Sequence, residues 1–324
     1  MSSSDEQFAI GIDIGATKIA SVLLSETGNV IRSSQLPTLV EEGKAAILDK
    51  VADQILELAQ QAPGGLAGTG IGSPGKVDAT RGVVYNAVNL GWDEVHLTGE
   101  IASRIQGSLP IWVQKDANLS ALGEQYFGAG QGLRDFIYLG IGSGLGAGLI
   151  SGGHLITGSD WYAADVGHLS VDPEGSLCVC GGRGCAETVA SGPGLVRVIQ
   201  QMLANSPTNT LLSNGVELTP TDILAAARQN DGLALTALAE VGRVLGIIMS
   251  ACTVILNPSR IVVGGGLGLA GYDFIIPAAR QELMRRTIPE SRALLEILPS
   301  QVESPAIGAA SLVWYMRSKE TVKN

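Results

Sequence analysis

The chain has 324 residues, of which 45% are hydrophobic and 16% charged, and its formal net charge at pH 7 is −10. This length predicts two domains that each bury a core, and the composition excludes an intrinsically disordered chain. The acidic balance argues against nucleic-acid binding, while the polar start and the lack of an apolar run near about 18 residues predict a cytoplasmic protein outside the membrane.

The N-terminal residues predict two strands joined by a glycine-containing turn. Residues 8–18 begin as an apolar strand and end in a turn that contains Gly15, Thr17 and Lys18, and residues 19–24 form the next strand. A hairpin turn then leads to a third strand at 30–36. A P-loop would need a helix after the glycines and a longer spacing, so the turn does not fit one. Its exposed backbone N–H groups are suited to bind a phosphate.

The next segment alternates helices and strands. The spacing of apolar residues predicts an amphipathic helix over 41–62, followed by a buried strand at 67–72. Residues 77–97, which include Asn89, show little apolar periodicity and are a candidate substrate loop. A short helix at 97–105, a short strand at 111–113 and a helix at 116–127 follow. Asp116 thus lies where a strand gives way to a helix, a position where carboxylates commonly act in open α/β folds.

The strand, glycine turn and strand pattern returns at residues 136–150, where Gly142, Ser143 and Gly144 form the turn. This internal repeat predicts two similar α/β halves with a cleft between them. Each half would carry one hairpin that binds phosphate through backbone N–H groups.

The remainder of the chain is mostly helical, with helices expected at 191–203, 222–229, 233–256, 274–286 and 307–316 and strands at 260–263 and 294–298. The helix at 233–256 is more apolar than one amphipathic face requires, so we expect it to be buried or to lie at a subunit interface. Gly264, Gly265 and Gly266 follow a strand and are suited to let a base and ribose lie against the backbone. Tight turns alone also require glycine, which leaves a purely structural role open.

Two glycine sets satisfy the dinucleotide-binding pattern literally, at residues 142–147 and 266–271. The first set is followed by a strand where that fold requires a helix. The second has no acidic residue placed after a following strand. We therefore do not expect a dinucleotide enzyme.

Residues 167–187 contain three of the four cysteines and one of the three histidines of the chain. The four side chains are those of His168, Cys178, Cys180 and Cys185. Four sulfur and imidazole donors that close a tetrahedron are typical of a structural Zn²⁺ site, and the intervening glycines allow a tight knuckle. The alternative is three buried free cysteines beside an unrelated histidine. A solvated glycine-rich loop offers no core for them, and a reducing compartment disfavours disulfides.

Together these motifs resemble those of the ROK family, which comprises bacterial sugar kinases and related repressors within the superfamily of sugar kinases, heat-shock chaperones and actin. The resemblance covers nearly the whole chain and rests on residues 13–18, 116–118, 142–144, 167–168, 178–187, 257–258 and 264–266. It implies two ribonuclease H-like (actin-like ATPase) α/β domains around a central cleft, with a small zinc knuckle. The small domain would span 1–116, with the C-terminal helix 307–324 packing back on it. The large domain would span 117–306 and contain the zinc site and a dimer interface.

The resemblance further implies ATP-dependent phosphorylation of a hexose hydroxyl, with glucose as the first expectation and with ATP, Mg²⁺ and structural Zn²⁺ as cofactors. Asp116 would be the general base, although a carboxylate there could also merely cap its helix. The nucleotide and its Mg²⁺ are assigned to Asp13, Gly15, Thr17, Lys18, Gly142, Ser143, Gly144, Gly264, Gly265 and Gly266. The sugar is assigned to Asn89, Lys115, Asp116, Asp165, His168 and Glu187, and His168 would also bind zinc with the three cysteines.

Two of these positions depart from the family pattern. Lys115 stands where the sugar kinases typically have Asn, and Asp165 stands where they have Glu, next to Ala164 in place of Gly. Lys115 can donate to a hydroxyl but not accept from one, and as a nearby cation it would depress the pKa of the base. Fructose, mannose or an N-acetyl-hexosamine as substrate, polyphosphate as donor, and a sugar sensor that has lost catalysis therefore stay open.

Expected partners are the sugar, ATP and further copies of this chain in a homodimer or larger homo-oligomer. The family's repressors carry a helix-turn-helix domain ahead of the first phosphate strand, whereas seven residues precede Phe8. This favours a kinase over a repressor.

Overall fold

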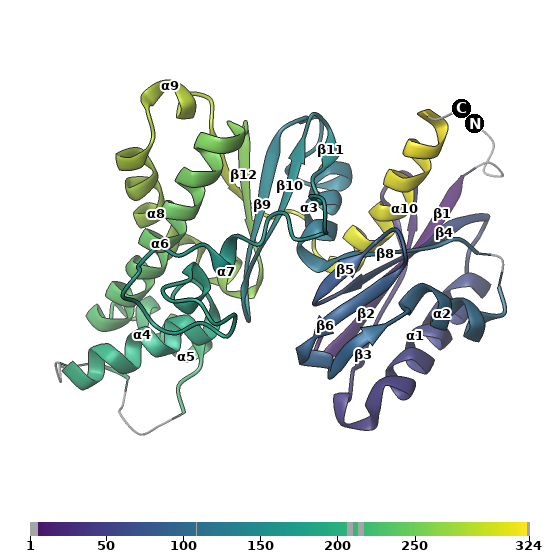
Figure 1. Cartoon of the computed structure of the whole chain (residues 1–324), viewed down its shortest axis with the longest axis horizontal. Coiled ribbons are helices and arrows are strands. Elements are labelled where there is room, and N and C mark those ends of the chain that lie inside the picture. The colour runs from purple at the N-terminus through teal and green to yellow at the C-terminus, as the bar shows by residue number, and fades with distance from the viewer. Residues whose placement is uncertain (1–5, 108, 206–209, 213–216, 323–324) are drawn as a thin grey trace. The chain divides into compact units, whose positions relative to one another are not determined.

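The structure is a computed structural model that describes residues 6–107, 109–205, 210–212 and 217–322 (Figure 1). These residues form two compact α/β units. The first unit comprises the described parts of Met1–Gly132, Thr157–Ala163 and Gln301–Asn324, and the second comprises those of Leu133–Ile156 and Ala164–Ser300. The predicted α/β class and its two sheet-based domains are confirmed.

The first unit is built on a five-stranded sheet in the order β3-β2-β1-β4-β8. Its strands are β1 (Gln7–Ile14), β2 (Lys18–Ser25), β3 (Val30–Pro37), β4 (Gly65–Ser73) and β8 (Ile111–Lys115). β1 runs antiparallel to β2 and parallel to β4, and β4 runs parallel to β8. The carboxyl ends of β1, β4 and β8 therefore lie along one edge of the sheet.

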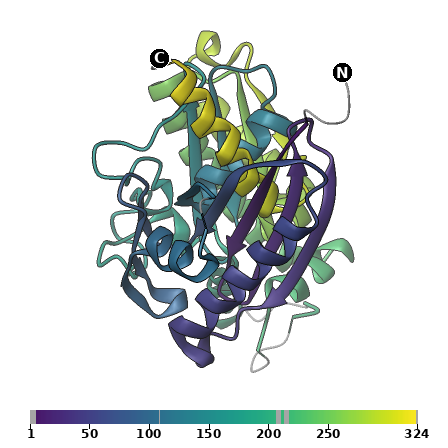
Figure 2. The same ribbon diagram turned by 90° about the vertical axis from the view of Figure 1, so that its right-hand side faces the viewer.

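Alternate residues of β1 face different helices because successive side chains of a strand point to opposite faces. Phe8, Ile10 and Ile12 pack in one core cluster with α1 (Gly43–Gln60) and α2 (Leu97–Ile105). Ala9 packs in another cluster, with α10 (Pro305–Val322). Figure 2 shows α1 and α10 on opposite sides of these strands.

Glycine at the centre of the sheet lets α10 approach the strands closely. A Cβ atom at Gly11 would lie 2.0 Å from the carbonyl oxygen of Ala306, and one at Gly70 would lie 1.9 Å from that of Ala309. No other residue fits at these two positions while α10 keeps its place.

The expected boundary at residue 116 differs from the observed division. Helix α3 (Asp116–Phe127) packs against α10, and both belong to the first unit. So does the segment Thr157–Ala163, whose Asp160 forms a 2.7 Å ion pair with Lys76.

The expectation of a loop over residues 77–97 is wrong for most of that segment. It contains strands β6 (Val83–Ala87) and β7 (Trp92–Val95), which together with β5 (Lys76–Asp78) form a three-stranded antiparallel sheet. These strands are only 3, 5 and 4 residues long, and buried residues do not alternate with exposed ones in β6 and β7, so the sequence carries no strand pattern there. Asn89 lies in the short 3-10 helix η2 (Val88–Leu90) between β6 and β7 and is exposed.

The second unit repeats the topology of the first around the order β11-β10-β9-β12-β13. These strands are β9 (Phe136–Ile141), β10 (Leu145–Ser151), β11 (His154–Leu155), β12 (Arg260–Gly264) and β13 (Glu296–Pro299). β9, β10 and β11 pair antiparallel, while β12 runs parallel to both β9 and β13. The predicted internal repeat is therefore present in the sheets.

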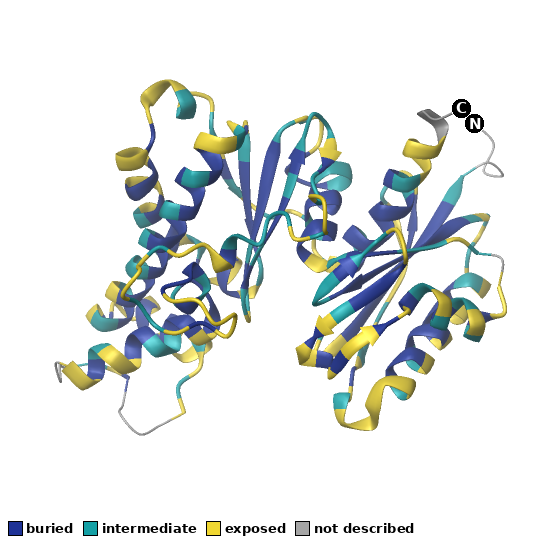
Figure 3. Ribbon diagram, in the orientation of Figure 1, coloured by how far each residue is buried: buried dark blue, intermediate teal, exposed yellow. Residues whose placement is uncertain are grey.

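The helices of the second unit are α4 (Gly192–Asn205), α5 (Pro220–Arg228), α6 (Gly232–Leu256), α7 (Gly266–Ala270), α8 (Tyr272–Arg286) and α9 (Pro289–Arg292). The larger ones begin and end close to the predicted positions. The strands β9 and β12 are almost wholly buried, as the dark blue segments of Figure 3 show, and Ile137, Leu139 and Ile261 pack in one core cluster with these helices.

Helix α6 is buried along most of its 25 residues, as expected, and Cys252 is one of its core residues. A Cβ atom at Gly242 would lie 2.2 Å from the carbonyl oxygen of Ile275, so its glycines let α8 pack closely. Among the helices of the described chain, α6 alone is long and apolar enough to cross a membrane. Its place in the core of the second unit accounts for that composition.

Candidate functional site

Asp13 and Asp116 lie at the same edge of the first unit's sheet. Asp13 is near the end of β1 and half-buried, and Asp116 follows the end of β8 and is exposed. A Cβ atom at Gly72, the β4 partner of Asp13, would lie 2.9 Å from the Asp13 Oδ1 atom, so glycine there leaves room for the carboxylate.

The electrostatic surroundings of Asp13 resist its ionisation. Burial, and after it the charge of Asp116, raise the pKa of Asp13 to about 7, while Lys18 acts in the opposite direction. A cation between the two carboxylates would relieve this cost. Hydrated Mg²⁺ prefers such carboxylate oxygens, so the pair fits the cation that the sequence predicts there.

Asp116 is the first residue of α3, and Lys115 is the capping residue, without a side-chain cap bond. The backbone N–H of Ala117 donates to the Asp116 Oδ1 atom at 2.7 Å. Capping at this helix start and a chemical role for the carboxylate are therefore compatible.

The strand-to-helix junction beside Asp116 is fixed by a buried amide that the sequence reasoning did not single out. The Gln114 Oε1 atom accepts from the backbone N–H of Lys115 at 2.8 Å and from the Asn118 Nδ2 atom at 3.2 Å. Both amide side chains are buried, and the Asn118 Oδ1 atom has no hydrogen-bond partner among the described residues. Two polar residues four apart across a strand–helix boundary are the only signal that the sequence carries for this support.

The first glycine turn has a fixed backbone and an exposed surface. The N–H of Gly15 donates to the carbonyl of Lys18 at 2.9 Å, while Thr17 and Lys18 are exposed. The hydroxyl of buried Thr38 donates to the carbonyl of Gly15 at 2.7 Å, and its N–H donates to the carbonyl of Thr17 at 3.1 Å. Thr38 was missed because its partners lie far away in the sequence.

The second glycine turn, in the second unit, is also held by backbone hydrogen bonds. The N–H of Gly142 donates to the carbonyl of Gly144 at 2.9 Å, and the N–H of Gly192 donates to the carbonyl of Gly142 at 2.7 Å. Ser143 is exposed at the tip. The N–H of Leu145 donates to the Glu187 Oε2 atom at 2.9 Å.

The third glycine set has a structural explanation at two of its three positions. A Cβ atom at Gly264 would lie 2.3 Å from the Tyr138 hydroxyl. Gly265 has φ of 80°, and its Cβ would lie 2.4 Å from the carbonyl oxygen of Ile141. Gly266 faces open space at the start of α7. Adenosine binding by these glycines stays a prediction.

The predicted metal ligands come together. One donor atom from each of His168, Cys178, Cys180 and Cys185 lies within 4.8 Å of the others. The Cys180 and Cys185 Sγ atoms are 3.6 Å apart, as are the Cys178 Sγ and His168 Nδ1 atoms. Cys180 is exposed, which contradicts the alternative of three buried free cysteines. Three sulfurs and one imidazole nitrogen fit a structural Zn²⁺ site.

The backbone of this knuckle bends through its glycines. Gly181 and Gly184 have φ of 87° and 62°, and a Cβ atom at Gly184 would lie 1.5 Å from the carbonyl oxygen of Asp172. The N–H of Gly182 approaches the Cys180 Sγ atom at 3.5 Å, and this contact lowers the pKa of the Cys180 thiol. Burial acts in the opposite direction at the neighbouring Cys185 and raises the pKa of that thiol.

The predicted sugar ligands are divided between the units. Asn89, Lys115 and Asp116 belong to the first unit, and Asp165, His168 and Glu187 belong to the second. His168 ends the 3-10 helix η3 (Val166–His168), and Glu187 lies in η4 (Ala186–Thr188), which packs against η3. Because Nδ1 of His168 lies against Cys178, Nε2 is the nitrogen available on the other side of the ring.

The neighbouring Ala164 has φ of 68°, a left-handed conformation that costs a residue with a Cβ atom about 1–2 kcal/mol. Glycine would adopt it without that cost. The departure from the family pattern at this position is therefore accompanied by local backbone strain.

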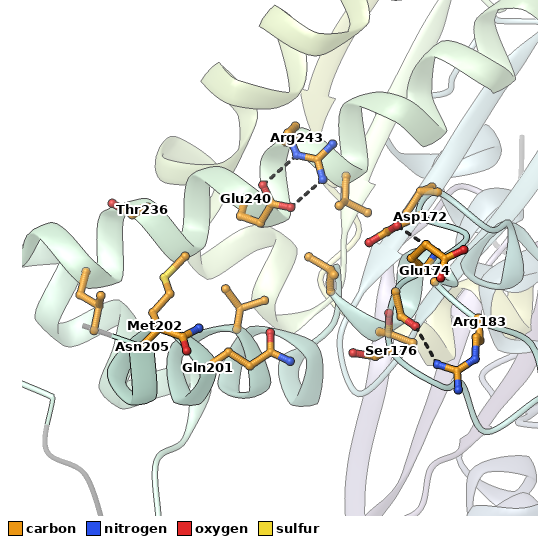
Figure 4. A pocket seen from close by; sticks show the side chains of 18 of the residues that line it. Asp172, Glu174, Ser176, Arg183, Gln201, Met202, Asn205, Thr236, Glu240 and Arg243 are labelled. Carbon is orange, nitrogen blue, oxygen red and sulfur yellow. Dashed lines mark hydrogen bonds and ion pairs between the residues drawn. The ribbon is translucent and has the colours of Figure 1, made fainter. Parts of the chain in front are cut away.

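A cavity of about 970 Å³ lies in the second unit, and none of the predicted site residues lines it (Figure 4). The knuckle forms one wall through Asp172, Glu174 and Arg183, and helices α4 and α6 form the other. On α6, Arg243 makes a two-pronged ion pair with Glu240 at 2.8 and 2.6 Å. No sequence pattern marks this cavity.

Comparison with known proteins adds relatives of two kinds. The ROK family model matches residues 9–315. A glucokinase from Thermotoga maritima is 33% identical over 312 residues, which cover 94% of this chain and 96% of the glucokinase. A xylose repressor from Caldicellulosiruptor bescii is 31% identical over 303 residues, which cover 92% of this chain but 75% of the repressor.

Among solved structures, a ROK family glucokinase from Streptomyces griseus in complex with glucose and AMPPNP is 34% identical. The match has a TM-score of 0.80 and covers 94% of this chain and 98% of that one. The family model, the relatives and the shared fold agree: the chain belongs to the ROK family.

Proposed function

We propose that this protein transfers the γ-phosphate of ATP to a hydroxyl of a hexose. Glucose is the proposed hexose, and Asp116 is the proposed general base. The pair formed by Asp13 and Asp116 at one sheet edge carries the proposal. Asp13 is half-buried with its pKa raised to about 7, which suits a cation ligand. Asp116 is exposed at the start of a helix, which suits a group that must reach a substrate.

In the proposed reaction Asp116 accepts the proton of the attacking hydroxyl while that oxygen forms a bond to the γ-phosphorus and ADP leaves. A protein catalyses phosphoryl transfer mostly by positioning the reacting groups. The hydrogen bond from the backbone N–H of Lys115 to Gln114 fixes the start of α3, and with it the position of Asp116. Mg²⁺, held by Asp13 through water, would neutralise phosphate charge. Lys18 and the backbone N–H groups of the two glycine turns would bind the phosphates.

The sugar hydroxyls would be bound by Asn89, Lys115, Asp165, His168 and Glu187. A metal ion on the Nδ1 side of His168 would fix the plane and tautomer of the ring, so that Nε2 meets a hydroxyl in a preset direction. Glucose is supported by the glucokinase relatives and by the glucose-bound Streptomyces griseus structure. Lys115 and Asp165 are the residues on which selectivity against mannose, fructose and N-acetyl-hexosamines would depend.

A coupled assay of ADP formation over these sugars tests the proposal, with polyphosphate replacing ATP in a parallel series. Asp116→Asn should lower kcat for glucose by at least about 100-fold, because it removes the proton acceptor. Asp53→Asn makes the same chemical change at an exposed position of α1 and should leave kcat unchanged. Full turnover by a folded Asp116→Asn protein would exclude Asp116 as the base.

A second candidate is a sugar-responsive regulator without kinase activity. This candidate is supported by the xylose repressor from Caldicellulosiruptor bescii, whose sequence identity to this chain is close to that of the glucokinase relatives. Calorimetric titration with glucose and xylose, with ADP formation measured in the same samples, separates the two. Binding of either sugar with no turnover of any sugar would support the regulator.

A further inference from the structure

We infer that Glu187 is a positioning residue for the second glycine turn in addition to its proposed contact with the sugar. One oxygen of its carboxylate would hold the turn in its nucleotide-binding form. The sugar-binding and phosphate-binding segments of the second unit would then be coupled and would move together. The inference rests on the proposed function, since that assigns the turn to nucleotide phosphate.

The carboxylate of Glu187 lies directly on the backbone of this turn. Its Oε2 atom accepts the N–H of Leu145 at 2.9 Å, and a Cβ atom at Gly144 would lie 2.4 Å from the same oxygen. A side chain at Gly144 would therefore displace the carboxylate from this position. Leu145 is buried, so shortening Glu187 would remove a charge-assisted hydrogen bond from a residue that lies away from solvent.

Leu145 is also where the turn meets the other sugar-binding segment. A Cβ atom at Gly167, the residue before His168, would lie 2.4 Å from the carbonyl oxygen of Leu145. The peptide groups of one residue therefore contact the segments that carry both His168 and Glu187. Displacement of either segment would be transmitted to the turn.

The backbone of Glu187 is itself fixed on both sides. The hydroxyl of Ser191 donates to the carbonyl of Glu187 at 2.8 Å, and the N–H of Ala186 donates to the carbonyl of Leu169 at 2.9 Å. The 3-10 helix η4 begins immediately after Cys185. The zinc knuckle thus sets the position of the carboxylate, and the carboxylate sets that of the turn.

Two oxygens allow Glu187 to serve both roles at once. With Oε2 engaged by the Leu145 N–H, Oε1 is the atom assigned to a sugar hydroxyl. Glutamine at this position can still accept the Leu145 bond through its carbonyl oxygen but offers a different second atom to the sugar. Aspartate keeps the charge but is one methylene too short to hold both atoms in place.

The test measures AMPPNP affinity by calorimetry in the absence of sugar, together with amide hydrogen exchange at Leu145. Glu187→Ala and Glu187→Asp should each weaken AMPPNP binding by about 10-fold and lose protection at Leu145, as expected when a charge-assisted bond to a buried N–H is broken. Glu187→Gln should keep both properties near wild type while weakening glucose binding. Glu174→Ala, an exposed glutamate of the same knuckle, is the matched control and should change neither.

Wild-type AMPPNP affinity and wild-type Leu145 protection in Glu187→Ala, or in Glu187→Asp if the alanine variant fails to fold, would overturn the inference and leave Glu187 as a sugar contact alone. Failure of the proposed function looks different. In that case the wild-type protein itself would not bind AMPPNP, while the exchange rate at Leu145 would still report on the hydrogen bond.

Discussion

Asp13 should make the protein less stable at neutral pH than it is in mild acid. In the folded chain its pKa is raised from 3.8 to about 7, so the folded state binds the proton more tightly than the unfolded state does. Stability attributable to this group is therefore present below about pH 4 and is lost as the pH rises to about 7. At 1.36 kcal/mol per pKa unit, the loss is about 4 kcal/mol.

The perturbation is Asp13→Asn, which keeps the shape of the side chain but cannot ionise. The variant should match the wild type in free energy of unfolding near pH 4 and exceed it by up to about 4 kcal/mol at pH 8, with no Mg²⁺ or nucleotide present. Urea unfolding at several pH values between 4 and 8 measures the difference. Added Mg²⁺ should stabilise the wild type and not the variant, because it binds only the folded carboxylate.

A free-energy difference that stays flat across this pH range, or an Asp13→Asn protein that is less stable than wild type at pH 8, would refute the reasoning. Asp116→Asn supplies an internal check. Because the charge of Asp116 contributes to the raised pKa of Asp13, removing that charge should reduce the pH dependence without abolishing it.

Two further outcomes follow from the knuckle and from the glycine contacts of α10. Cys180→Ala should abolish stoichiometric zinc, measured by plasma mass spectrometry, and should raise the glucose KM or unfold the second unit; normal zinc content with normal kinetics would contradict the site. Gly70→Ala should lower the free energy of unfolding by about 2–3 kcal/mol, because its Cβ would lie 1.9 Å from the Ala309 carbonyl oxygen. The control Gly99→Ala, on an exposed part of α2 with open space around it, should raise stability by about 0.5–1 kcal/mol instead. Equal effects of the two substitutions would argue against the close packing of α10.

The sequence predicted the parts of the fold that depend on local patterns. Apolar periodicity located α1 and α6, and the repeated glycine turns revealed that the two sheets share a topology. The clustering of His168 with three cysteines was also predictable, because these residue types have few other uses in a glycine-rich loop. In each case neighbouring residues carry the information.

What the sequence did not predict depends on residues that are distant along the chain. The boundary of the first unit lies beyond α3 because Glu124 in that helix accepts the backbone N–H groups of Gln301 and Val302. Thr38 and Gln114 support the candidate site through hydrogen bonds to the backbone, and no local sequence pattern predicts these bonds. The hydrogen bond between Glu187 and Leu145 joins residues 42 positions apart, so it too could not be predicted from a local pattern.

The place of α10 in the first unit also determines the order in which the protein can be completed during synthesis. The face of β1 and β4 that contains Gly11 and Gly70 is covered by a helix that leaves the ribosome after the entire second unit. Domains generally fold as units from the N-terminus onward. Here the order is reversed: the second unit can finish while the first still exposes an uncovered sheet, so the nascent first unit is the part most in need of protection from aggregation.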